Sequence, residues 1–170
     1  MSVIKSVCET KPTLQFGSQG GNVRALQNGL NNHFGQRQQI ATDGNFGRVT
    51  ERAVKIIQYR SFLEQDGIVG PKMWHVLCTG SLFEQPVLRR GSTGALVGRV
   101  QQVLKQGQFY QGTPDQEFGP LTEAAVKVFQ GDRGLLRDGI IGDETWFALR
   151  ELANILTATA NPNAELVKTP

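Results

Sequence analysis

The residues best suited to chemistry in this sequence are three cations and one aromatic side chain, spaced along a single predicted helix. Arg48, Arg52, Lys55 and Tyr59 follow one another at intervals of four, three and four residues. At about 100° per residue, their side chains project within roughly 60° of one another. Guanidinium groups bind carboxylates through paired hydrogen bonds, and Asn45, just before the helix, adds an amide. The pattern therefore predicts a binding face for an anionic ligand.

The same residues also fit a less specific interpretation, an ordinary solvated helix face. Glu51 lies within the cationic stretch and can pair with its neighbours. A polar face opposite an apolar stripe is the usual arrangement of a surface helix and identifies no ligand by itself. Both interpretations stay open on the sequence alone.

Residues for catalysis or metal binding do not converge. An active site needs a nucleophile beside a base, two convergent carboxylates or a bound metal. His75 and Cys78 lie three residues apart and could start a metal site, but no second close Cys/His pair completes the spacing of a zinc site. The sequence contains no phosphate-binding loop and no dinucleotide fingerprint. We therefore expect no enzyme activity, no metal and no cofactor.

Four aspartates resemble candidate catalytic carboxylates but fit turns better. They are Asp43, Asp66, Asp115 and Asp138. Asp-Gly pairs favour turns, because glycine accepts a positive φ and aspartate can accept a hydrogen bond from its own backbone. We predict that these carboxylates are structural.

The two cysteines, Cys8 and Cys78, are disulfide candidates. Closing a loop of about 70 residues contributes roughly 4 kcal/mol in the chain-entropy model of disulfides. Two unrelated buried thiols are the alternative. A disulfide would indicate an oxidising compartment.

The elements that must hold these residues belong to an internal duplication. The first part of the unit repeats at a spacing of 74 residues, which pairs Leu14, Gly17, Ser18, Gly20, Val23, Gln27 and Leu30 with Leu88, Gly91, Ser92, Gly94, Val97, Gln101 and Leu104. After a two-residue shortening the spacing becomes 72, which pairs Asp43, Phe46, Gly47, Gln58, Asp66, Gly70 and Trp74 with Asp115, Phe118, Gly119, Gln130, Asp138, Gly142 and Trp146. So many ordered matches identify two copies of one module.

Each copy predicts three helices. The first helix carries apolar residues at Val23, Leu26 and Leu30, the spacing of one buried stripe. The second and third helices each follow a glycine that recurs at the same place in both copies. Two of these glycines are followed by proline, which suits the first helical position. The predicted fold is all-α, as two tandem three-helix bundles with six helices from about Gly20 to Leu156.

The predicted domain boundaries follow from the repeat. They are an N-terminal extension at 1–12, module 1 at 13–80, a linker at 81–87, module 2 at 88–156 and a polar tail at 157–170. The tail lacks periodicity, so we expect it to be mobile or extended.

Charge and hydropathy limit the classes of partner that this sequence can have. The net charge is +3, and residues 1–80 hold nine Lys/Arg against five Asp/Glu while residues 81–170 hold nine against ten. Nucleic-acid binders usually show a concentrated basic stripe, and no apolar run approaches the roughly 18 residues of a membrane span. We expect neither nucleic-acid binding nor membrane insertion. The first residues lack the apolar core of a signal peptide.

The repeated motifs resemble the peptidoglycan-binding-domain-like family. The second copy carries them as DQEFGPLTEAAVKVFQ and GLLRDGIIGDETWFAL. The first copy departs at Phe62, Met73 and Ile57, where the family has Gly, Thr and Phe. The resemblance covers roughly residues 13–153. It implies three-helix modules of the kind appended to cell-wall hydrolases. On physical grounds we predict that Gln27, Gln58, Gln101 and Gln130 brace loops by hydrogen bonds, with contact to a ligand as the alternative.

The resemblance implies a bacterial function, non-catalytic binding of peptidoglycan that anchors a protein to the cell wall. Peptidoglycan would be the partner, with a cell-wall hydrolase as a further candidate partner, and the location would be cell wall, periplasm or extracellular space. With no signal peptide in the sequence, a cytoplasmic location stays open. A protein–protein adaptor built on the same module is the alternative function. Because only the first copy has the cationic helix face, we expect it to bind the wall and the second to support it.

Overall fold

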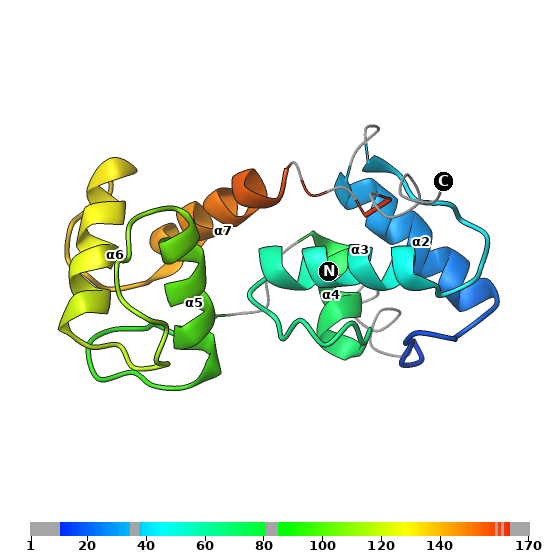
Figure 1. Ribbon diagram of the computed structural model, residues 1–170, viewed down its shortest axis with the longest axis horizontal. Helices are drawn as coiled ribbons and strands as arrows, with labels where there is room; N and C mark the ends of the chain where they lie inside the picture. The colour runs from blue at the N-terminus through cyan, green and yellow to red at the C-terminus, as the bar shows by residue number, and fades with distance from the viewer. Residues whose placement is uncertain (1–10, 35–37, 81–84, 159, 161, 164–170) are drawn as a thin grey trace, which may run out of the picture. The chain divides into compact units, whose positions relative to one another are not determined.

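The computed structural model describes residues 11–34, 38–80, 85–158, 160 and 162–163. Within them lie six α-helices (Figure 1), which are α2 Gly21–Phe34, α3 Arg48–Arg60, α4 Pro71–Thr79, α5 Ala95–Gln106, α6 Pro120–Asp132 and α7 Asp143–Thr157. The helices form two units, Met1–Phe83 with Ala160–Pro170 (unit 1) and Glu84–Thr159 (unit 2). The predicted all-α fold of two three-helix modules is confirmed.

Glycines set the starts of the second and third helices in both units. Gly47, Gly70, Gly119 and Gly142 are the N-cap residues, and each has an extended backbone. Proline occupies the start of α4 and of α6, where its missing N–H has no partner within the helix. The turn residues therefore fix where each helix begins.

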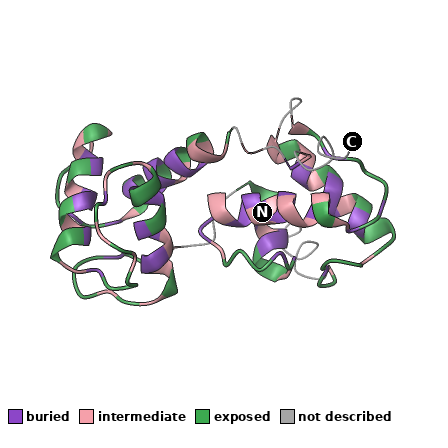
Figure 2. Cartoon of the chain, in the orientation of Figure 1, coloured by how far each residue is buried: buried purple, intermediate pink, exposed green. Residues whose placement is uncertain are grey.

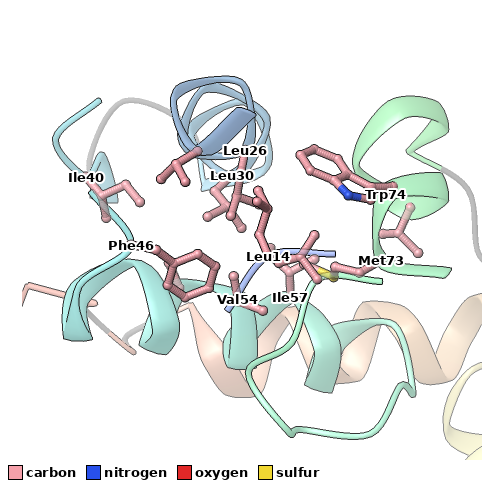
Figure 3. Close-up of a cluster of buried hydrophobic side chains, with 13 residues drawn as sticks. Leu14, Leu26, Leu30, Ile40, Phe46, Val54, Ile57, Met73 and Trp74 are labelled. Carbon is pink, nitrogen blue, oxygen red and sulfur yellow. The ribbon is translucent and has the colours of Figure 1, made fainter. Parts of the chain in front are cut away.

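The core of unit 1 gathers apolar side chains from all three helices (Figure 3). Leu26 and Leu30 of α2 are fully buried, as the predicted stripe requires. They face Val54 of α3 and the ring of Trp74 on α4. Burying side chains of this size contributes roughly 1.5–3 kcal/mol each, which holds three short helices at fixed angles.

Unit 2 repeats this core with its own residues. Val97, Val100 and Leu104 of α5 have no exposed surface, and Phe129 of α6 is equally enclosed. Buried and exposed positions alternate around each helix in both units (Figure 2). The duplicated sequence therefore builds the same packing twice.

Extended segments tie each bundle together without forming sheets. In the described residues the pairings are isolated bridges, two in each unit. They are Leu14 with Val69 and Gln19 with Asn45 in unit 1, and Leu88 with Ile141 and Thr93 with Glu117 in unit 2. The indole N–H of Trp74 donates to the carbonyl of Pro12 at 2.9 Å, which satisfies the polar atom of a buried tryptophan. Unit 2 has the same bond, from Trp146 to Pro86.

The predicted tail, expected to be mobile or extended, is described only in part, at 157–158, 160 and 162–163. Helix α7 extends to Thr157, and the described residues from Ala160 onward belong to unit 1. Gln38 donates to the carbonyl of Ala160 at 3.2 Å, and Asn163 donates to the carbonyl of Gln39 at 2.9 Å. Residues 160 and 163 of this segment are thus held by hydrogen bonds that could not be predicted from a sequence pattern.

Candidate ligand-binding site

Four buried glutamines, here called glutamine knots, position the loops around the candidate site. They are Gln27, Gln58, Gln101 and Gln130. The amide of Gln27 donates to Asp43 at 2.8 Å and to the carbonyl of Asn45 at 3.1 Å, and its oxygen accepts the backbone N–H of Gly44. The other three glutamines make corresponding bonds to their own turns. The prediction that these glutamines brace loops is confirmed.

The four aspartates are turn residues. Asp43 accepts the backbone N–H of Asn45 at 2.8 Å, and this bond, with the one from Gln27, lowers the pKa of the Asp43 carboxyl. Bonds from Gln101 and Glu117 lower the pKa of Asp115, and bonds from Ile140 and Gln130 lower that of Asp138. These carboxylates are engaged as acceptors, which supports the structural interpretation.

One detail of the turns differs from the sequence expectation. The turn at Asp115 contains no glycine, because Gln116 follows the aspartate. Gln116 nevertheless adopts a φ of 66°, a conformation that glycine takes more readily. The hydrogen bonds that Gln101 makes to the backbone N–H groups of Asp115 and Gln116 hold this turn in place.

A hollow of about 550 Å³ lies beside α3 in unit 1. Its lining residues are Phe16, Arg48, Glu51, Arg52 and Lys55. The structure therefore brings together the three cations that the sequence predicted on one helix face. Its volume lies within the usual range of small-ligand sites, about 300–1,000 Å³.

The cations of the hollow differ in how firmly they are held. Lys55 forms an ion pair with Glu51 at 2.8 Å, one helical turn away. Arg52 donates to the carbonyl of Pro162 at 3.3 Å, so the end of the chain helps to orient its guanidinium. Arg48, at the N-terminal end of α3, is exposed. The hollow thus combines two cations held by contacts with one that is exposed to solvent.

The aromatic residue of the hollow is Phe16, whereas the sequence pointed to Tyr59. Phe16 lies in the loop before α2 and is 58% exposed. Tyr59 is half-buried, and burial raises the pKa of its phenol to about 12. Neither Tyr59 nor Asn45 is among the lining residues. Helical periodicity could not indicate Phe16, because a loop residue has no helical phase.

Unit 2 contains a related face with a different set of cations. Lys127 and Glu123 form an ion pair at 2.6 Å, the counterpart of Lys55 and Glu51. Arg90 lies 3.6 Å from the other oxygen of Glu123. The hydrogen bond from Lys127 is the main cause that lowers the pKa of Glu123, and the charges of Lys127 and Arg90 add to it. The sequence comparison along the helix alone missed Arg90.

A second arginine of unit 2 was also missed. A Cβ atom added to Gly131 of α6 would overlap the guanidinium of Arg137. Arg137 therefore lies directly against the helix backbone, one turn after Lys127. Gly131 has no side chain, which leaves room for the Arg137 guanidinium. Because Arg137 lies in the loop after α6, comparing the faces of the two helices could not reveal this contact.

The cysteines fall partly outside the described structure. Cys78 is disulfide-bonded, and the chain has one other cysteine, Cys8. Cys8 lies outside the described residues, so its pairing with Cys78 stays a prediction.

Other classes of site find no support in the described residues. In that part of the chain, no group of three or more His, Cys, Asp or Glu side chains is arranged to hold a metal ion. None of the helices described there has the length and apolar character needed to cross a membrane.

Comparisons with known proteins give related sequences. The chain is 30% identical over 175 residues to the N-acetylmuramoyl-L-alanine amidase CwlL of Bacillus licheniformis, covering 89% of this chain and 49% of that protein. It is 35% identical over 95 residues to the zinc D-Ala-D-Ala carboxypeptidase of Streptomyces albus G, covering 52% and 37%. The chain thus spans no more than about half the length of these two relatives.

The solved structures that are similar include the N-terminal domain of SleB. It shares 37% identity with a TM-score of 0.41, and the alignment covers 42% of this chain and 97% of that domain.

The family assignment comes from both modules. A family model described as "Putative peptidoglycan binding domain" matches residues 19–77 and residues 93–149. The two matches fall on α2 to α4 and on α5 to α7. Because together they cover more than half of the chain, this protein belongs to that peptidoglycan-binding-domain family, in two tandem copies.

Proposed function

We propose that this chain binds bacterial peptidoglycan without cleaving it, and that the hollow beside α3 is a binding site. The observation that carries the proposal is the convergence of Arg48, Arg52 and Lys55 with the exposed ring of Phe16. Peptidoglycan offers peptide carboxylates, which guanidinium groups bind through paired hydrogen bonds. It also offers sugars, whose apolar faces can pack on an aromatic ring.

The family and the relatives support the same ligand. The family is named for peptidoglycan binding, and the relatives include an amidase and a spore cortex-lytic enzyme of Bacillus cereus. Since the chain spans only part of their length, we propose that it corresponds to a targeting segment. It would then act at the cell wall or outside the cell, with a wall hydrolase as its functional partner.

A protein–protein adaptor is the second candidate, and one observation favours it. Unit 2 has a hollow of about 650 Å³ lined largely by apolar surface, including Leu135 and Phe147. Phe147 is 62% exposed, whereas the equivalent residue of unit 1 is His75. If this surface served the main function, Phe147→Ser would abolish attachment while the α3 variants would not.

The test is a co-sedimentation isotherm with purified sacculi. The Arg48→Ala/Arg52→Ala variant is expected to lose affinity about tenfold, because two charge-assisted hydrogen-bond donors disappear. A matched control removes two cations elsewhere, Lys105→Ala/Arg150→Ala, and should bind like the parent. Binding of the parent should weaken as salt rises, since the Debye length falls from about 10 Å at 0.1 M to about 3 Å at 1 M. A parent that does not co-sediment refutes the proposal.

A further inference from the structure

The two units carry the same charged pair in the same place. Glu51 and Lys55 of α3 are 2.8 Å apart, and Glu123 and Lys127 of α6 are 2.6 Å apart. Such pairs one turn apart are common on helices and stabilise them only slightly. The pair alone therefore identifies a shared position and no ligand.

A glycine turn packs against each pair and fixes it. Gly67 has a φ of 75°, and a Cβ added there would lie 3.0 Å from both Glu51 and Lys55. Gly139 has a φ of 77°, and its added Cβ would lie 2.8 Å from Glu123 and 2.9 Å from Lys127. The backbone of each turn thus touches the aliphatic stems of the pair. This close approach leaves both lysines more than 40% exposed.

Each pair is flanked by two arginines, yet the arginines come from different positions. In unit 1 they are Arg48 and Arg52, on the helix itself. The equivalent positions of unit 2 hold Pro120 and Ala124, which carry no charge.

Unit 2 draws its two arginines from the loops on either side of the helix. Arg90 precedes α5 and reaches Glu123 at 3.6 Å, while Arg137 follows α6 and lies over Gly131. The equivalent positions of unit 1 hold Phe16 and Gln65. Each face therefore presents two arginines and one lysine beside one glutamate, although neither arginine position is shared. The two faces therefore carry the same set of charged residue types, although their arginines stand at different positions of the repeat.

We propose that unit 2 has its own anion-binding site, formed by Arg90, Lys127 and Arg137 on the face of α6, and that its ligand is a carboxylate of the wall peptide. Arg90 is 65% exposed and Arg137 is exposed as well, so both guanidinium groups are open to a ligand. Their planar geometry suits bidentate binding of a carboxylate. Lys127 adds a point charge between them along the helix. The inference rests on the proposed function, because it assigns the same ligand class to a second site.

Two sites on one chain make binding bivalent. Once one unit is bound, the other meets its ligand at a high effective concentration, so the pair binds more tightly than either unit alone. This departs from the expectation that the second unit only supports the first. Bivalent binding also predicts a different affinity for sacculi when one site is removed than when both are removed.

The experiment measures binding of the full chain to purified sacculi for three variants and one control. Arg48→Ala/Arg52→Ala and Arg90→Ala/Arg137→Ala are each expected to weaken binding about tenfold or more, and the quadruple variant to leave only residual binding. Lys105→Ala/Arg150→Ala, which removes the same charge from α5 and α7, should bind like the parent. All four arginines lie at exposed or half-buried positions, so the variants should fold, which hydrogen exchange checks.

A fourth variant tests the geometry without changing any charge. Gly131→Ala would displace the Arg137 guanidinium from α6, while alanine within a helix is at least as stable as glycine. Its affinity for sacculi should fall in the same direction as that of Arg137→Ala. Binding equal to the parent would remove Arg137 from the site.

The remaining outcomes separate the inference from the proposed function. If the parent binds and Arg90→Ala/Arg137→Ala binds equally well, the site of unit 2 is refuted and that of unit 1 stands. If the parent does not bind, both proposals fail. Sacculi from which phosphodiester polymers have been removed chemically should bind as before. Loss of binding on their removal would show that phosphate is the ligand and overturn the assignment to a carboxylate.

Discussion

The two units share a fold almost residue for residue, yet they differ on the surface beside their second helix. Both hold their loops with glutamine knots, both begin the helix after a glycine, and both anchor a buried tryptophan to an extended segment. Beside α3 the hollow is lined by helix cations and Phe16. Beside α6 the helix supplies Lys127, and the two arginines come from loops, at Arg90 and Arg137. The buried hydrogen bonds are therefore nearly the same in the two units, whereas the charged residues of the exposed face stand at different positions.

The difference teaches that a helix-face comparison underestimates a surface built partly by loops. On α6 the positions that correspond to the cationic face of α3 hold Pro120, Ala124, Lys127 and Gly131. With one cation among them, these positions alone indicate no anion-binding face. Once the chain is folded, Gly131 becomes the place where a loop arginine rests. Two surfaces can present the same charged groups from different positions of the repeat, provided that the side chains reach the same region beside the helix.

The largest expected difference between the units lies in the disulfide. We predict that Cys8 pairs with Cys78 and constrains unit 1, while the second copy of the repeat has Leu82 and Arg150 at the equivalent positions. Closing a loop of about 70 residues should stabilise unit 1 by roughly 4 kcal/mol. Hydrogen exchange of α2 to α4 in the Cys8→Ser/Cys78→Ser variant should therefore quicken strongly, with α5 to α7 unchanged.

The control for the disulfide is a thiol titration of the denatured parent without reductant. Two free thiols per chain would contradict the pairing directly. Equal acceleration of exchange in both units would show that the bond acts on the whole chain and is not a feature that separates the units.

The next difference lies in the glutamine knots. Gln130 bonds to Asp138, to the carbonyl of Ile140 and to the hydroxyl of Thr145 at 3.2 Å. Gln58 makes the corresponding bonds to Asp66 and Ile68, but unit 1 has Met73 where unit 2 has Thr145, and a thioether has no hydroxyl.

Removing either knot should unfold its own unit first. Gln130→Leu leaves several polar groups of a buried turn without partners, which costs about 3 kcal/mol. Gln58→Leu should cost about 1 kcal/mol less, because one hydrogen bond fewer is lost. Unit-resolved hydrogen exchange measures both changes. Equal losses for the two variants would mean that the hydroxyl of Thr145 contributes nothing, and a larger loss for Gln58→Leu would contradict the predicted order.

Most of the fold was predictable because it follows from repeated local signals. The buried stripe at Val23, Leu26 and Leu30 and the glycine before each later helix act over a few residues, so the sequence alone places the helices. The glutamines were also interpretable, since a polar residue repeated inside an apolar pattern must find partners when it is buried.

The site was only partly predictable, because its remaining members depend on contacts across loops. Phe16 and Arg90 occupy equivalent places before the first helix of each unit, a difference in the repeat that in hindsight marks the variable surface. Arg137 could not be placed without knowing the space over Gly131. The bond from Arg52 to Pro162 joins residues 110 positions apart, and no periodicity carries that information.

The smallest expected effect is electrostatic and concerns Glu123. Its pKa is lowered by the hydrogen bond from Lys127 and by the charges of Lys127 and Arg90. A carboxyl with a lowered pKa stabilises the folded state above its unfolded-state pKa, and this contribution is lost as the pH falls through the lower folded-state pKa. The affected window therefore lies below the ordinary glutamate value of 4.5. Because the group is only partly buried, the effect should shrink as salt rises.

Two variants resolve which cation matters more to Glu123. Lys127→Ala should raise the carboxyl pKa of Glu123 most, because it removes the main hydrogen bond, and Arg90→Ala should raise it less, because it removes only a charge at 3.6 Å. The measurement is an NMR titration of the Glu123 side-chain carbon between about pH 2 and pH 7, a range that brackets the ordinary glutamate pKa. Lys105→Ala is the matched control and should leave the curve unchanged. If Arg90→Ala also leaves the curve unchanged, Arg90 does not lie beside this carboxylate in solution, and the face of unit 2 loses one of its two arginines.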